Sequence, residues 1–152
     1  MPASLPPFSA PASEARVLRA FGEEVILHLD SESTGGTLNL WTEITPPGGG
    51  PPPHYHERED EWFLVQEGRV SFLGNGEWQE FGPGAVIFMP RGNVHAFKNV
   101  GTTPSRMLLS TTPGGFDKFF GRCEEEFARR GGPEMERVVA IAAEHGIHFI
   151  PS

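Results

Sequence analysis

Short segments in which apolar and polar residues alternate occupy the first two thirds of the chain. They are rich in aromatic and β-branched residues and are separated by turn formers, which is typical of strands in an all-β domain. Gly74, Asn75 and Gly76 predict a tight hairpin, because Asn-Gly tolerates positive φ. The predicted strands are 24–30, 37–45, 54–56, 60–66, 70–73, 77–81, 85–89 and 105–112.

The alternation in residues 37–45 assigns one face of that strand to the interior. Leu38, Leu40 and Ile44 share a parity, and we expect them to face the core. Trp41 would then lie on the outer face, where a large aromatic side chain suggests contact with another sheet or a second subunit. Residues 85–89 are almost all apolar, which predicts a strand buried on both faces.

From Gly115 onward the period of the apolar residues changes to about 3.6, which predicts helices. A first helix should carry Arg129 and Arg130 in its last turn and stop at Gly131-Gly132. Its apolar stripe could be core or could cover the mouth of a barrel, and both alternatives stay open. A second helix should open at Pro133 and end at Gly146, before a short closing strand at 147–150. The stripe contains Phe116, Phe119, Phe120, Cys123 and Phe127.

Length and composition indicate one intracellular domain. The 152 residues suit a single domain, with a loose Pro/Ala/Ser-rich arm at 1–15, a barrel at 24–112 and C-terminal helices at 115–146. The formal charge of -8, without a basic cluster, argues against nucleic acid and anionic membranes as partners. Cys123 is the only cysteine, and the N-terminus lacks an apolar signal segment. We therefore expect a cytoplasmic protein without disulfides.

Two histidines and a glutamate in residues 48–68 have the spacing of a metal site. His54 and His56 are two apart and point to the same face of an extended strand. Glu61 heads the next strand and would face them after a turn through the charged residues 57–60. Two imidazoles and a carboxylate suit a divalent transition metal. The run Pro46–Pro53 would be a stiff segment that aims the histidines.

The chain resembles the cupin superfamily in two motifs. Residues 48–68 fit Gly-x5-His-x-His-x4-Glu-x6-Gly, and residues 84–99 fit Gly-x5-Pro-x-Gly-x2-His-x3-Asn, with no position missing. The resemblance implies a double-stranded β-helix, or jelly-roll barrel, in which His95 joins His54, His56 and Glu61 around one metal. A finer similarity is to small cupins grouped with quercetin 2,3-dioxygenases. Cupins of this size are commonly homodimers, which is the expected assembly.

This ligand set predicts an enzyme of the oxygenase type. Three neutral imidazoles and one carboxylate leave a net charge of about +1 on a divalent ion, which favours a small enolic or aromatic chelating substrate. Two open positions would accept substrate and dioxygen, with Glu61 as candidate base. Alternatives are an oxygen-independent isomerase, lyase or decarboxylase, and a non-catalytic binding or sensing module. The metal could be Fe, Mn, Ni, Cu, Co or Zn, and Phe63, Val65 and Phe97 should line the substrate pocket.

The remaining polar residues near these motifs have ordinary interpretations. Glu57, Glu59 and Asp60 read as a solvated acidic turn, although one of them could instead hold a ligand histidine in place. His28, His145 and His148 match no motif position and read as surface or core histidines. Cys123 lies on the apolar helix stripe, and we expect it to be an unreactive side chain packed in the core.

Overall fold

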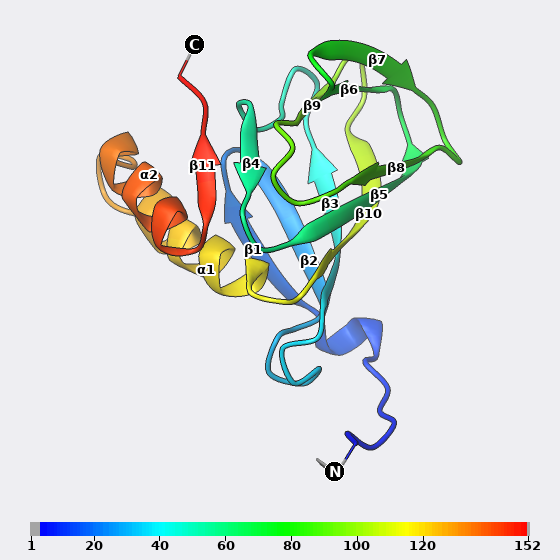
Figure 1. Ribbon diagram of the computed structural model, residues 1–152, viewed down its shortest axis with the longest axis vertical. Coiled ribbons are helices and arrows are strands. Elements are labelled where there is room, and N and C mark those ends of the chain that lie inside the picture. The colour runs from blue at the N-terminus through cyan, green and yellow to red at the C-terminus, as the bar shows by residue number, and fades with distance from the viewer. Residues whose placement is uncertain (1–3, 152) are drawn as a thin grey trace.

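The fold is a barrel of antiparallel strands with two helices packed at one side (Figure 1). The computed structural model describes residues 4–151. The strands are β1 (Arg16–Ala20), β2 (Glu23–Leu29), β3 (Asn39–Thr45), β4 (His54–His56), β5 (Asp60–Glu67), β6 (Val70–Gly74), β7 (Glu77–Phe81), β8 (Val86–Met89), β9 (Ala96–Asn99), β10 (Ser105–Thr112) and β11 (Ile147–Phe149). The helices are a 3-10 turn at Ala12–Glu14, α1 (Phe116–Phe127) and α2 (Met135–Glu144).

Three sheets form the double-stranded β-helix predicted from the sequence. The largest has six strands in the order β1-β2-β3-β10-β5-β8, and the others are β7-β6-β9 and β11-β4. Non-consecutive neighbours such as β3-β10 and β10-β5 are the long-range pairings of a jelly roll. No helix among the described residues is long and apolar enough to cross a membrane.

Several local predictions hold. Asn75 and Gly76 have φ of 52° and 76°, as the predicted Asn-Gly hairpin between β6 and β7 requires. Strand β10 has the predicted bounds, and the short closing strand exists as β11, paired with β4. Residues 4–15 of the predicted arm are almost all exposed, and residues 1–3 lie outside the described part of the chain. Strand β1 was not predicted.

The predicted orientation of β3 is wrong. Trp41 is fully buried and stacks on Phe116, with ring centroids 4.1 Å apart and an interplanar angle of 6°. Leu40 and Ile44 are only half-buried on the opposite face. The barrel interior contains a cavity, and Glu43 of β3 lines it beside Trp41. Burying the large indole outweighs burying the smaller aliphatic side chains.

The expectation that 85–89 is buried on both faces is also wrong. Among the described strands β8 is the edge of the six-stranded sheet and pairs only with β5, and Val86 and Phe88 are 65% and 60% exposed. Because Trp41 is interior, the homodimer prediction loses the argument drawn from that residue. It remains a prediction, and the apolar edge of β8 is the surface that now favours it.

The Pro46–Pro53 segment is held against β9 by its backbone. Gly48 N–H donates to the Asn99 carbonyl (2.8 Å), and Asn99 N–H donates to the Gly49 carbonyl (2.9 Å). Gly50 has φ of 146°, and a Cβ there would lie 1.9 Å from the Phe97 carbonyl oxygen, so only glycine permits this approach. The segment therefore enters β4 from a fixed position.

The helices differ from prediction at their ends. Helix α1 stops at Phe127, so Arg129 and Arg130 follow it instead of forming its last turn, and Arg129 pairs with Glu126 at 2.7 Å. Helix α2 begins at Met135, two residues after Pro133. Cys123 is fully buried, and burial raises the pKa of its thiol to about 12, which fits the prediction of packing.

Candidate metal centre

Backbone pairing brings the three motif histidines together. His54 and His56 alternate with Tyr55 on β4 and are both buried, while Tyr55 is only half-buried. His54 and His95 exchange two backbone hydrogen bonds, of 3.0 and 2.8 Å, in an isolated antiparallel bridge. One ring nitrogen of each histidine lies within 4.8 Å of the other two. This cluster could hold a metal ion.

The outer nitrogen of each imidazole has an acceptor. Nδ1 of His54 donates to the Pro52 carbonyl at 2.9 Å, and Nδ1 of His95 donates to the Asn93 carbonyl at 3.1 Å. Nδ1 of His56 donates to the Glu59 carboxylate at 3.1 Å. Since a neutral imidazole carries one N–H, each Nε2 keeps its lone pair. Three such lone pairs are the donor set that a divalent transition metal requires.

Glu61 completes the set at its edge. Its Oε1 lies 3.3 Å from Nε2 of His95, and its side chain is 6% exposed. With Nδ1 of His95 already donating, a carboxylate oxygen and an imidazole lone pair face each other, and this is favourable only with a proton or a cation between them. The residues present therefore fit a metal, with His54, His56 and His95 as the cluster and Glu61 beside it.

The electrostatics keep the donors available. Burial lowers the pKa of His54 to about 3, assisted by the nearby His95 and His56. Burial acts to raise the pKa of Glu61, but the hydrogen bond that a protonated His95 would donate and the positive charge of the histidines when protonated lower it overall. For His56 burial acts to lower the pKa, and the hydrogen bond to Glu59 with the charges of Glu61 and Glu59 raises it overall. A metal at this site would compete with a proton on His56.

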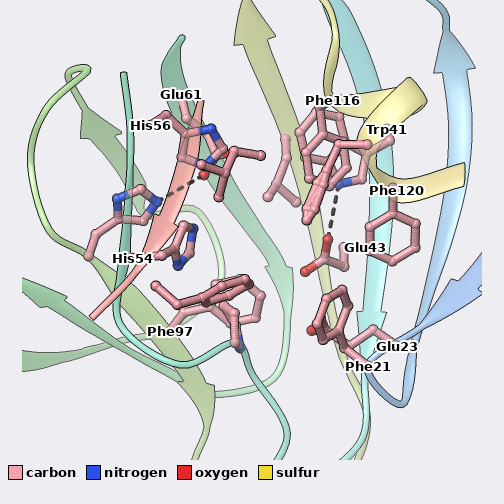
Figure 2. A pocket seen from close by; sticks show the side chains of 16 residues that line it. Phe21, Glu23, Trp41, Glu43, His54, His56, Glu61, Phe97, Phe116 and Phe120 are labelled. Atoms are coloured by element: carbon pink, nitrogen blue, oxygen red, sulfur yellow. Dashed lines mark hydrogen bonds and ion pairs between the residues drawn. The ribbon is translucent and has the colours of Figure 1, made fainter. Parts of the chain in front are cut away.

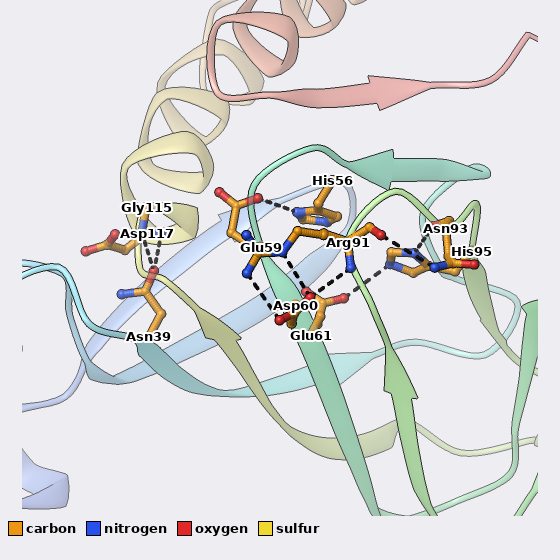
Figure 3. Close-up of polar contacts among 10 residues, drawn as sticks. All are labelled: Asn39, His56, Glu59, Asp60, Glu61, Arg91, Asn93, His95, Gly115 and Asp117. Carbon is orange, nitrogen blue, oxygen red and sulfur yellow. Dashed lines mark hydrogen bonds and ion pairs between the residues drawn. The ribbon is translucent and has the colours of Figure 1, made fainter.

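Glu59 is not part of a solvated turn. It is 6% exposed and orients the His56 ring, which is the alternative role considered for one of these acids (Figure 3). Glu57 and Asp60 have other partners. Glu57 contacts Nε2 of His148 at 2.6 Å, and Asp60 accepts from Arg91 at 3.2 Å through both Nε and a terminal guanidinium nitrogen. The Asp60–Arg91 pair ties the start of β5 to the loop that carries His95.

Replacing Glu59 by glutamine should weaken metal binding about 10- to 100-fold, because His56 would lose the charged acceptor that fixes its tautomer and raises its basicity. Competition with a chelator of known affinity would measure the change. Glu57→Gln, two residues earlier and on the surface, is the matched control and should leave affinity within about twofold. Equal losses in the two variants would mean that Glu59 does not orient the ligand.

The histidines line one end of a cavity (Figure 2). The cavity has a volume of about 60 Å³, so it favours a small compound. Phe97 lines the cavity, as predicted from its parity, whereas Phe63 and Val65 are buried in the core and are not among the lining residues. Much of the wall consists of Phe and Trp side chains, namely Phe21, Trp41, Phe97, Phe116, Phe119, Phe120 and Phe149.

Helix α1 supplies part of this wall. Its first residues are fixed to β3, because Oδ1 of Asn39 accepts from the backbone N–H groups of Gly115 (3.0 Å) and Asp117 (3.2 Å) (Figure 3). The Asp117 carboxylate in turn accepts from the Ser31 hydroxyl at 2.6 Å. The apolar stripe of α1 is therefore both core and cavity wall.

A second polar group in the cavity was missed by the sequence analysis. Glu23 of β2 and Glu43 of β3 are 5% and 4% exposed and line the cavity opposite the histidines (Figure 2). Burial raises the pKa of Glu23 to about 7 and the pKa of Glu43 well above its ordinary value, with the charge of Glu23 adding to the latter. The two residues are 20 positions apart in the sequence, and the pairing of β2 with β3 brings them together.

The raised pKa of Glu23 predicts a pH-dependent effect on stability. Between its ordinary pKa of 4.5 and about 7 the folded state binds the extra proton, so this group stabilises at low pH and the contribution is lost as pH rises through the folded pKa. The stability of the wild type relative to Glu23→Gln should therefore fall by about 1–3 kcal/mol from about pH 5 to about pH 8. Urea unfolding of the metal-free proteins measures it, and a difference independent of pH would contradict it.

The other histidines lie outside the cluster. Nε2 of His28 contacts the Thr42 hydroxyl at 2.7 Å, and His145 stacks on Phe119 with centroids 6.0 Å apart. His148 stacks on Tyr55 at 5.0 Å and contacts Glu57. Their packing and surface roles agree with the sequence interpretation.

Comparison with known proteins identifies the domain. Residues 41–111, which contain all four motif ligands, match the family model described as a cupin domain. This segment is a cupin domain, and the solved structures below share its fold. No curated protein matches it significantly.

Solved structures share the fold. A predicted oxalate decarboxylase from Thermotoga maritima is 24% identical with a TM-score of 0.64, over 70% of this chain and 99% of that one. KdgF from Halomonas sp. is 18% identical with a TM-score of 0.65, over 74% and 99%. The polyketide cyclase RemF from Streptomyces resistomycificus is 26% identical with a TM-score of 0.58, over 69% and 78%. The varied functions in these names leave the reaction of this chain open.

Proposed function

We propose that the protein is a metal-dependent enzyme that acts on a small planar compound with enolic or phenolic oxygens, as an oxidoreductase of the dioxygenase type. The observation that carries the proposal is the cluster of three buried imidazoles with outward-bonded Nδ1 atoms at one end of an aromatic cavity. A divalent ion held there would supply positive charge to the oxygens of the ligand.

The chain's own residues would orient the ligand, exclude water from it and accept a proton. The aromatic walls favour a flat apolar ring and exclude water, which strengthens polar interactions inside the cavity. Glu61 is ionised and lies beside His95, where it could take a proton from a hydroxyl group of the ligand. The cavity volume favours one ring over the three rings of a flavonol, so we propose a smaller substrate than that of a quercetinase.

Dependence on oxygen tests the reaction type. Metal-loaded protein should consume dioxygen with catechol or an enolic 1,3-dicarbonyl compound, and the His56→Ala variant should not. Product formation that proceeds unchanged without dioxygen would exclude the oxygenase. Binding of these compounds without any turnover would instead favour a non-catalytic binding module.

A non-oxidative isomerase, lyase or decarboxylase is the second candidate. The Glu23–Glu43 pair favours it, because two buried carboxyl groups with raised pKa values can hold and return a proton near neutral pH. RemF, which is a polyketide cyclase by name, offers a related precedent at 26% identity. The anaerobic reaction described above separates this candidate from the oxygenase.

A further inference from the structure

The Glu23–Glu43 pair is a second polar patch in the cavity wall, opposite the histidines and beside aromatic side chains. Oε1 of Glu23 accepts from the Thr45 hydroxyl at 2.8 Å, and Oε1 of Glu43 accepts from Nε1 of Trp41 at 3.1 Å. The second oxygen of Glu43 points toward the cavity (Figure 2). The charge of Glu23 raises the pKa of Glu43 further, since the two carboxyl groups are neighbours in the cavity wall.

Within residues 4–151 the pair has no cationic partner of its own. Among the described residues no Lys or Arg forms an ion pair with either carboxyl group, and the neighbouring charge that acts on Glu43 besides Glu23 is the carboxylate of Glu61. A buried acidic pair without a counter-ion is costly, since desolvation is repaid only by hydrogen bonds or opposite charge. A ligand group that donates hydrogen bonds would supply what the protein does not.

The surrounding rings suit the same kind of group. The ring centroid of Phe120 lies 6.1 Å from that of Phe21 and 5.4 Å from that of Phe116. The ring of Trp41 stacks on Phe116. The negative faces of aromatic rings attract ammonium groups, and their apolar surface excludes water from a hydroxyl. A structural role for the carboxyl groups would not require that they face a cavity.

We propose that the Glu23–Glu43 pair is a binding subsite for a hydrogen-bond-donating head group, an ammonium or a hydroxyl, carried by a small single-ring ligand. The proposed function is needed only for the claim that the other end of the ligand contacts the histidines. The subsite itself does not depend on it. The subsite would select ligands with a donor group at the end remote from the metal. Glu23 and Glu43 would then determine ligand specificity. Neither residue lies within the two cupin motifs.

Three probes of matched shape test the subsite without any metal. Benzylamine, benzyl alcohol and toluene share one ring and differ in the head group. Binding to metal-free protein is followed through the Trp41 indole N–H signal in NMR, which reports on Glu43 directly. We expect benzylamine, benzyl alcohol or both to bind at least about tenfold more tightly than toluene and to shift this signal. Preference for benzylamine alone identifies the head group as an ammonium.

Glu23→Gln and Glu43→Gln should each reduce the preference over toluene to within about threefold. Glu24→Gln is the matched control, because Glu24 is the next residue of β2 and pairs with Arg19 at 3.0 Å instead of lining the cavity. The proposal is overturned if toluene binds as tightly as both polar probes, if none of the probes moves the Trp41 signal, or if Glu24→Gln matches the effect of the other two variants. If the histidine cluster bound no metal, the proposed function would be overturned, but the result for this subsite would be unchanged.

Discussion

Replacing Trp41 by alanine should lower the free energy of unfolding by about 3–5 kcal/mol, the usual range for a buried tryptophan or phenylalanine. Trp41 is 0% exposed, stacks on Phe116 and donates its indole N–H to Glu43. The variant loses the buried area and the stacking, and it leaves the Glu43 carboxyl group with one donor fewer. Urea unfolding monitored by circular dichroism would measure the loss.

Trp78→Ala is the matched control for this prediction. Trp78 lies on β7 and is 52% exposed, so the same substitution should cost less than about 1 kcal/mol. Equal costs for the two variants would mean that β3 does not turn Trp41 inward, and the cavity described here would lose one wall.

The second large effect is expected at His95. His95→Ala removes one of three Nε2 donors while the backbone bridge to His54 can remain, so metal affinity should fall by at least about a hundredfold with little change in the fold. Titration of metal-free protein with Co²⁺, followed by its visible absorption, measures the affinity and reports the coordination.

His28→Ala serves as the control for this titration. His28 is a histidine of β2 that contacts Thr42 and takes no part in the cluster, so its replacement should leave the affinity within about twofold. If His28→Ala and His95→Ala weakened binding alike, the metal would not be held by the cluster of His54, His56 and His95.

Local spacing predicted that His54, His56 and Glu61 converge, and the resemblance to the two cupin motifs joined His95 to them. His54 and His56 share a face of one short strand, and the second motif places His95 after a turn at Pro90 and Gly92. Strands with clear alternation and turns with Asn-Gly were predicted for the same reason. These features depend on neighbours within a few residues and need no knowledge of the tertiary contacts.

The errors arose where tertiary packing decides. Both faces of β3 carry apolar residues, so parity alone could not tell that Trp41 and Glu43 face a cavity while Leu40 and Ile44 face outward. In the sequence Glu59 cannot be distinguished from its acidic neighbours, because its contact with His56 depends on the conformation of the turn. Val86 and Phe88 read as core because an edge strand and a central strand can have the same composition.

Elemental analysis of the wild-type protein, purified without added metal, tests the central claim most directly. The three-histidine cluster predicts about one equivalent of a transition metal per chain in the wild type and a large loss in His56→Ala. Less than about half an equivalent, with the wild type and His56→Ala alike, would contradict the claim that these residues form a metal centre.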